Sequence, residues 1–116
     1  VIFAFHLHTM NNYFKLIDTD ALDTLLLKGT FPFSKYLFWD TGIENIDLAK
    51  NSRYVIERVL TRGQLKDFYL LTRIYNNDQI KAALIKSREL DAKTVNFCSL
   101  YFNIPINEMH VAPFYS

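Results

Sequence analysis

The chain has 116 residues, of which half are apolar and 16% are aromatic, and its formal net charge is +1. A chain of this length suits a single domain and supplies enough apolar surface for a sizeable core. Glycine and proline number only three each. Together with the aromatic content, this excludes a linker, a low-complexity segment and an intrinsically disordered chain.

Charge is spread unevenly along the chain. Residues 1–47 carry a net charge of −3, residues 48–93 one of +5, and residues 94–116 one of −1. An acidic front half beside a basic middle can reflect a polar partner surface. Solvated helix faces produce the same pattern, and we take them as the leading explanation.

The first ten residues, VIFAFHLHTM, are apolar but do not form a targeting segment. They lack a basic start and are far shorter than the roughly 20 residues that span a bilayer. We therefore expect no membrane association. Our hypothesis is that Met10 is the biological start and that residues 1–9 are a non-native or disordered extension. If the segment is native, its alternating apolar residues allow a short edge strand.

Two segments follow in the front half of the chain. Asp18 and Asp20 precede a run of leucines that ends at Gly29, and acids before and a glycine after such a run predict a short helix. Residues 31–40, FPFSKYLFWD, are dense in aromatic rings, while Pro32 argues against a long helix there. We expect an irregular or short helical segment that docks its rings on the domain as a lid, with Trp39 as its anchor.

Four short helices are predicted between residues 48 and 103. Gly63 stands where the first should end, Asn76 and Gln79 have the spacing of a capping box, and Asp91 can cap the last helix. Pro105 prevents that helix from continuing far. Residues at helical spacing are assigned to the core: Val55, Ile56, Val59, Leu60, Leu65, Phe68, Leu71, Thr72, Tyr75, Ile80, Ala83, Leu84, Ser87, Val95, Cys98, Tyr101 and Phe102.

The fold prediction is an all-α, compact bundle of about four to five short helices with an irregular aromatic N-terminal segment. A helix-turn-helix is one form that this bundle could take. We assign residues 10–116 to a single helical domain whose core covers residues 37–105. The two-proline tail is expected to pack loosely or to pair as a short extended piece.

No motif in the chain points to catalysis or to a metal. The three glycines are isolated, so there is no phosphate-binding loop. His6 and His8 could share a metal on one side of a strand, but further ligands are distant in sequence. The acids Asp40, Glu44 and Asp47 do not have calcium-loop spacing and fit caps and turns better. We expect no catalytic residue, no cofactor site and no metal site.

Cys98 is the only cysteine, which rules out a disulfide within the chain. A lone thiol suits a reducing compartment, and we expect the protein to be cytoplasmic. No histidine or acid lies near Cys98 in sequence, so a small buried apolar residue is a better description than a nucleophile.

Nucleic-acid binding is the main alternative to a protein partner. The two helices around residues 89–91 could form a helix-turn-helix, but the second one carries Lys93 as its only basic residue, and readers of a DNA groove need more. The basic residues that could contact phosphates lie instead on the two earlier helices: Arg53, Arg58, Arg62, Lys66 and Arg73.

Residues 37–105 resemble an uncharacterised helical domain of unknown function from Bacteroidetes and other bacteria. The resemblance rests on LFWD at residues 37–40, on VIERVL and RG at residues 55–63, and on TVNF and YFNIP at residues 94–105. It implies a role as an antitoxin or accessory protein beside nucleotidyltransferase-type toxins. The same residues have a structural explanation, in which Glu57 pairs with Arg53 and Arg58 turns to Asp40.

The sequence therefore favours a non-enzymatic protein-interaction module, an antitoxin-like partner being its more specific form. The alternative is a helix-turn-helix-like regulator that binds nucleic acid. The surface that we expect to contact a partner is formed by the aromatic side chains of the front segment: Phe31, Phe33, Tyr36, Phe38 and Trp39. The alternative, which we favour slightly, is that these rings simply belong to the core.

Overall fold

A computed structural model describes residues 14–112 of the chain, and within that range the protein is all-α, with five α-helices and no strand. The α-helices are α2 (Thr19–Leu27), α3 (Ser52–Arg62), α4 (Leu65–Ile74), α5 (Asn77–Lys86) and α6 (Ala92–Tyr101). Short 3-10 helices stand between and after them: η2 (Phe14–Leu16), η3 (Lys35–Phe38), η4 (Ile43–Asn45) and η5 (Ile106–Glu108). The predicted fold class is confirmed.

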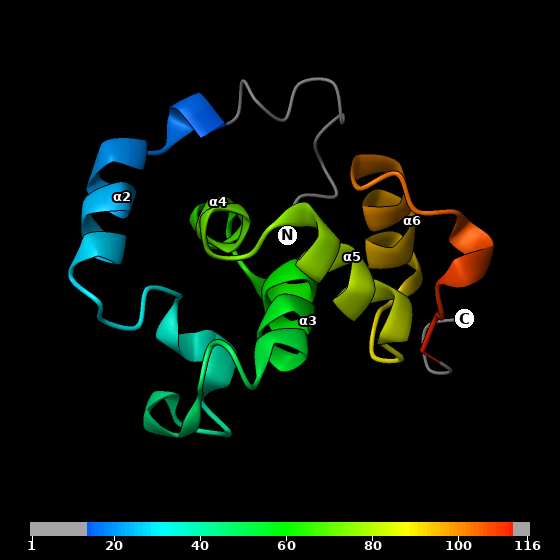
Figure 1. Cartoon of the computed structure of the whole chain (residues 1–116), viewed down its shortest axis with the longest axis horizontal. Helices are drawn as coiled ribbons and strands as arrows, with labels where there is room; N and C mark the ends of the chain where they lie inside the picture. Colours follow the sequence, from blue (N-terminus) through cyan, green and yellow to red (C-terminus); the bar gives the residue numbers. More distant parts are fainter. Residues whose placement is uncertain (1–13, 113–116) are drawn as a thin grey trace.

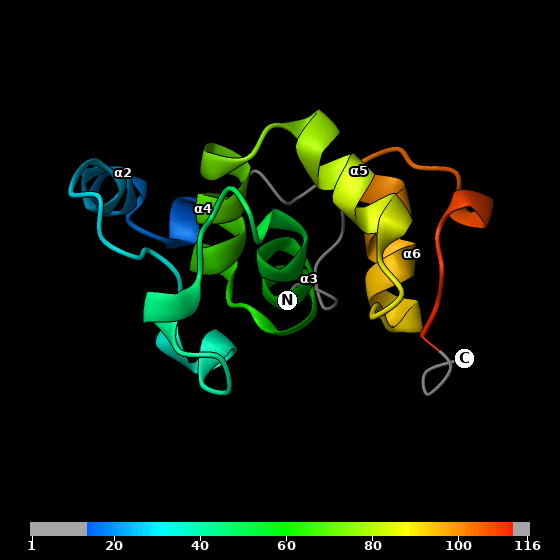
Figure 2. The same ribbon diagram turned by 60° about the horizontal axis from the view of Figure 1, so that its bottom comes forward.

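The helices follow one another across the molecule. Figure 1 shows α3 and α4 in the middle, α2 at one end beside α4, and α6 at the other end beside α5. The second view keeps the same order (Figure 2). α3 makes its most extensive helix-to-helix contacts with α5 and α4. Because α3 lies between these elements, one of its sides is buried while the other lies at the surface.

Helix ends are set by residues that the sequence singled out. The side chain of Asp18 accepts a hydrogen bond from the Ala21 amide at the start of α2, and Gly29 follows that helix with a φ of 73°. Asn76 and Gln79 form the predicted capping box of α5. Asp91 stands at the start of α6, but its carboxylate accepts from the Thr94 hydroxyl rather than from a helix amide.

Gly63 ends α3 as predicted, for a different reason from the expected one. Its φ of −73° is open to every residue type. A Cβ atom at this position would lie 2.6 Å from the Val59 carbonyl oxygen and 3.1 Å from the Cβ of Asp67. Glycine is therefore required by crowding in the two-residue turn between α3 and α4, where the last turn of α3 and the Asp67 side chain of α4 leave no room for a Cβ atom.

A single hydrophobic core runs through α3, α4, α5 and α6. Val55, Ile56, Phe68 and Leu84 are fully buried within it. The predicted core residues are buried, apart from Leu65, Thr72 and Tyr101, which are partly exposed. Further core members come from outside the predicted helices: Phe33, Leu37, Phe38, Leu90, Ile104 and Met109.

The front segment docks on the helices as predicted, through a different set of rings. Phe33 and Phe38 are buried, and Phe38 makes edge-on ring contacts with Phe31 at 5.4 Å and with Tyr54 at 5.7 Å. Trp39, the expected anchor, is 79% exposed. That expectation was wrong. The rings of Phe33 and Phe38 are buried in the core, whereas Trp39, at the turn that follows η3, faces solvent.

Asp67 fixes the front segment to the bundle. This buried carboxylate accepts hydrogen bonds from the Ser34 amide at 2.8 Å, from the Ser34 hydroxyl, and from the Gln64 amide at 2.9 Å. One side chain thus caps α4 and holds the start of η3.

The described part of the tail packs on the domain, which excludes the first of its two expected forms, loose packing. Ile104 and Met109 are buried, and the Ala112 amide donates to the Leu90 carbonyl at 2.8 Å. The predictions for residues 1–9, including those for His6 and His8, lie outside the described residues. No helix in the described range is long and apolar enough to cross a membrane.

Candidate interaction surface along helix α3

The exposed side of α3 is lined by a series of shallow hollows. Neighbouring hollows share lining residues: Arg53 and Lys86 line two of them, and Tyr54 lines three. We call this continuous depression the α3 groove. Its opposite wall is formed by α5 and by residues 88–91, with Ala112 at one end.

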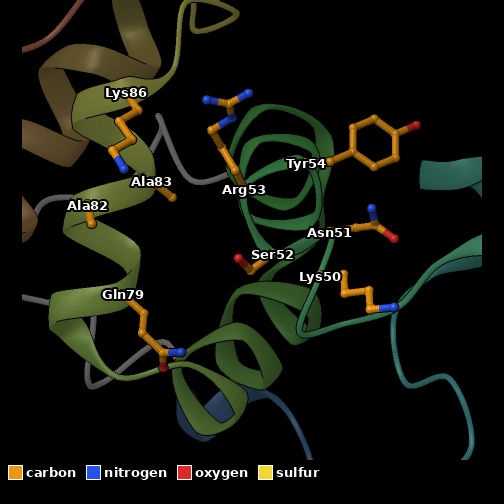
Figure 3. A pocket seen from close by; sticks show the side chains of 9 residues that line it. All are labelled: Lys50, Asn51, Ser52, Arg53, Tyr54, Gln79, Ala82, Ala83 and Lys86. Atoms are coloured by element: carbon orange, nitrogen blue, oxygen red, sulfur yellow. The ribbon is translucent and has the colours of Figure 1, made fainter.

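The hollow at the amino end of α3 is the largest of these, at about 510 Å³. Figure 3 shows Ser52 and Arg53 on its α3 side and Gln79 and Lys86 on its α5 side, whereas Lys50 is directed away from α5. Of the nine described residues that line it, three are basic and none is acidic. This end of the groove therefore has a positive potential.

The groove becomes mixed in charge farther along α3. A hollow of about 380 Å³ is lined by Glu57, Arg58, Arg62 and Glu89, among others. Glu57 lies 3.7 Å from Arg53, which is the predicted pair. Burial raises the pKa of the Glu57 carboxyl above its usual value, against the opposing effects of a hydrogen bond with Ser87 and the charge of Arg53. The charged form of Glu57 is therefore disfavoured by the fold.

Arg58 joins the groove to the front segment. Its guanidinium donates to the Asp40 carboxylate at 2.8 Å and to the Leu37 carbonyl at 2.9 Å, and it lies 4.8 Å from the centre of the Tyr54 ring. The hydrogen bonds from Arg58 lower the pKa of the Asp40 carboxyl. Asp40, the residue after Trp39, is thus held against α3.

Two aromatic side chains next to this pair face solvent. Trp39 is 79% exposed and Tyr36 is 48% exposed. The Tyr36 hydroxyl donates to the Arg62 carbonyl at 2.7 Å, which holds its ring beside the end of α3. The backbone around Trp39 is fixed on one side by buried Leu37 and Phe38 and on the other by Asp40, so the indole projects from a rigid turn.

The five residues predicted as an aromatic partner surface therefore divide into two groups. Phe33 and Phe38 are buried, so for them the alternative that these rings belong to the core is confirmed. Phe31 is partly buried and packs edge-on against both of those rings. Trp39 and Tyr36 alone keep large exposed areas.

The five basic residues predicted for nucleic acid do not form one free surface. Arg58 pairs with Asp40, Arg53 with Glu57, and Arg73 with Asp23 at 3.6 Å. Within the described residues, Arg62 and Lys66 are the members of this set without an ion pair, and both are exposed.

The described residues contain no cluster of histidine, cysteine and acidic side chains that could hold a metal. Cys98 is fully buried, and burial raises the pKa of its thiol to about 12. The thiolate required of a nucleophile is therefore scarce at neutral pH. The acids Asp40 and Asp47 have structural partners, since Asp47 accepts from the Ala49 and Lys50 amides within its own turn.

Sequence reasoning did not identify the far wall of the groove. Gln79 and Lys86 lie on α5, more than 25 positions after Ser52 in the sequence, and no local pattern connects them. The available signal was indirect, namely that Lys86 falls on the polar side of a helix whose apolar residues were assigned to the core.

Comparison with known proteins gives one match. The chain matches no curated protein and no solved structure. The resemblance to a domain of unknown function is supported over residues 37–84, while the TVNF stretch of α6 and the YFNIP stretch at residues 101–105 lie outside the matched range. Residues 33–84, which include Trp39, all of α3 and most of the α3 groove, are similar to a family of unknown function, DUF6922.

Proposed function

We propose that the chain is a non-enzymatic protein-interaction module whose contact surface is centred on Trp39 beside the α3 groove. The observation that carries this proposal is the 79% exposure of the only tryptophan, between buried Leu37 and Phe38 and the Asp40–Arg58 ion pair. A large ring on a rigid turn loses little conformational entropy when a partner covers it. Tryptophan, tyrosine and arginine are the residues most enriched at the energetic centres of interfaces.

The surroundings of Trp39 define the partner's chemistry. Tyr36 supplies a second partly exposed ring, and the groove beside it carries more basic than acidic side chains. The complementary surface is an apolar pocket for the indole with an acidic rim. Such charge complementarity steers association and makes its rate sensitive to salt.

An antitoxin-like partnership with a nucleotidyltransferase-type toxin is the specific form of this proposal that the family resemblance implies. In this form of the proposal, the partner is a toxin whose gene lies beside the gene for this chain. Co-purification from the native host, followed by identification of the bound protein, would distinguish that partner from others.

The experiment compares binding of the co-purified partner to the wild type and to Trp39→Ala. We expect at least about a tenfold loss of affinity, because truncating a central anchor residue has effects of this size. The matched control is Leu100→Ala, since Leu100 is 69% exposed but lies on α6. Circular dichroism and thermal unfolding establish that both variants remain folded. Equal affinity of Trp39→Ala and the wild type would contradict the proposal.

Nucleic-acid binding is our second proposal. Among the described residues, Arg62 and Lys66 are the two of the five predicted basic residues that are exposed and have no ion pair, so they are the ones that would contact phosphates. A duplex bound through phosphates would be released as salt rises. Replacing both residues with glutamine would then abolish the gel shift at 50 mM salt. No shift for the wild type under these conditions would exclude this function.

A further inference from the structure

We propose that the hollow between the amino end of α3 and α5 binds a small ligand through a phosphate group. This inference does not depend on the proposed protein contact at Trp39. The hollow measures about 510 Å³, which lies within the range of small-molecule sites.

Charge is the first argument for an anion. Arg53 and Lys86 approach the hollow from two different helices, so both can contact one bound group (Figure 3). None of the nine described lining residues is acidic. Glu57 lies 3.7 Å from Arg53 at the border of the hollow, but Arg53 keeps 60% of its side chain exposed and its remaining donors free for a ligand.

The second argument is that two side-chain oxygens beside the hollow already accept hydrogen bonds. The Gln79 side-chain oxygen accepts from the Asn76 amide, and the Asn51 side-chain oxygen accepts from the Asp47 amide. Gln79, on the α5 side, therefore has its NH₂ group left to donate toward the hollow, whereas Asn51 is directed away from α5, as Lys50 is (Figure 3). Because Asn51 is occupied in this way, no side chain caps the first turn of α3.

Together these groups make the hollow rich in donors and poor in acceptors. The Arg53 guanidinium, the Lys86 ammonium and the Gln79 NH₂ group all donate, and the Ser52 hydroxyl can do so. A phosphate group supplies several acceptor oxygens with negative charge, and its hydrogen bonds to charged donors are strong. A cation or an apolar ligand would leave these donors without partners, so phosphate is the chemistry that the hollow fits.

The test is a titration of the full chain followed through its backbone amide NMR signals. The probes are inorganic phosphate and adenosine 5′-monophosphate, with chloride at equal ionic strength as the reference. We expect saturable shifts of the Ser52 and Arg53 amides with one or both phosphate probes. Tighter binding of the nucleotide would identify an organic phosphate as the ligand, and equal binding would identify the phosphate group alone.

Variants separate this site from general electrostatic attraction. Arg53→Gln and Lys86→Gln should each weaken binding roughly tenfold, because each removes a charged donor. Lys50→Gln removes the same charge from a residue that lines the hollow but is directed away from α5, and it should change affinity less than about twofold. Trp39→Ala should leave phosphate binding unchanged, so the two proposals can fail separately.

Several outcomes would overturn the inference. One is the absence of saturable shifts with both phosphate probes, and another is an equal loss of binding in the Lys50 and Lys86 variants. A third is binding of a single-stranded oligonucleotide that is weakened as much by Arg62→Gln and Lys66→Gln as by Lys86→Gln. That result would identify a diffuse polyanion surface in place of a site.

Discussion

Phe68 occupies the centre of the aromatic packing that joins the front of the chain to its last helix. Its ring lies 5.9 Å from Phe14, 5.2 Å from Tyr101, 6.0 Å from Phe97 and 6.4 Å from Phe102. All but the first of these contacts are edge-on, which is the favoured geometry of ring pairs. Phe68 is therefore fixed by neighbours from two distant parts of the chain, η2 and the α6 region.

We expect Phe68→Ala to lower the free energy of unfolding by about 3–5 kcal/mol, because it removes a fully buried ring and leaves a cavity. Urea denaturation measures the change. Leu100→Ala, at an exposed site, should stay within about 0.5 kcal/mol of the wild type. A loss below about 1 kcal/mol for Phe68→Ala would mean that the core does not depend on this ring.

Cys98 provides a prediction on pH. Burial raises the pKa of its thiol from 9.0 to about 12. Since the folded pKa exceeds the unfolded one, the favourable contribution of the neutral thiol is complete below pH 9 and is lost as pH rises toward 12. Cys98→Ala should show a shallower loss of stability over that window. Part of the loss should remain, because burial also raises the pKa of Tyr75 to about 12.

The same residue allows a direct measurement of reactivity. At pH 8 a thiol reagent should modify the folded protein slowly and the urea-unfolded protein at once, because the sulfur is buried and protonated in the fold. Rapid reaction of the folded protein would instead indicate an accessible, activated thiol and would reopen the question of a nucleophile.

At the scale of elements, the junction between η3 and α4 depends on one carboxylate. Asp67 accepts hydrogen bonds from the backbone amides of Ser34 and Gln64. It therefore caps the start of α4 and at the same time holds the distant segment that leads into η3. No local sequence pattern singles out Asp67. Its role depends on Ser34, which is 33 positions away, and no spacing rule connects the two.

We expect Asp67→Ala to lower the free energy of unfolding by roughly 2–4 kcal/mol, because two backbone amides and a hydroxyl in a partly buried junction lose their acceptor. Chemical denaturation gives the value. Asp78→Ala is the control, since Asp78 is an exposed acid in the first turn of α5 and should change stability by less than about 1 kcal/mol. Equal costs for the two variants would show that Asp67 acts only on the helix dipole.

For the whole molecule, the core cluster extends from Phe33 to Met109 without a break into separate groups. The front segment and the helices should therefore unfold together. In a urea titration followed by NMR, the amide signals of Leu37 in η3 and Leu84 in α5 should disappear at the same midpoint.

α2 is the expected exception to that cooperativity, because none of its residues is buried. Its amides should exchange with solvent faster than those of α3. If the Leu37 signals were lost well before those of Leu84, the front segment would be a separate unit that packs on the helices without sharing their stability.

Helix positions were largely predictable from the sequence because their causes are local. Capping residues such as Asn76 act within one turn, and apolar periodicity identifies the buried side of each helix without knowledge of its neighbour. The surface was much less predictable. Five clustered aromatic rings looked equivalent in sequence, yet Phe38 is fully buried and Trp39, its neighbour, is the most exposed of the five.

The sequence by itself determined that this protein is a small all-α domain, which helices it contains, and which residues form most of its core, since each of these follows from contacts within a few residues. Only the tertiary structure decided what lies on the surface. Trp39 is exposed because Leu37 and Phe38 on one side and the Asp40–Arg58 pair on the other fix its turn. Arg53 and Lys86 face one hollow because α3 packs beside α5, and that packing joins residues too far apart in sequence for any local rule to connect.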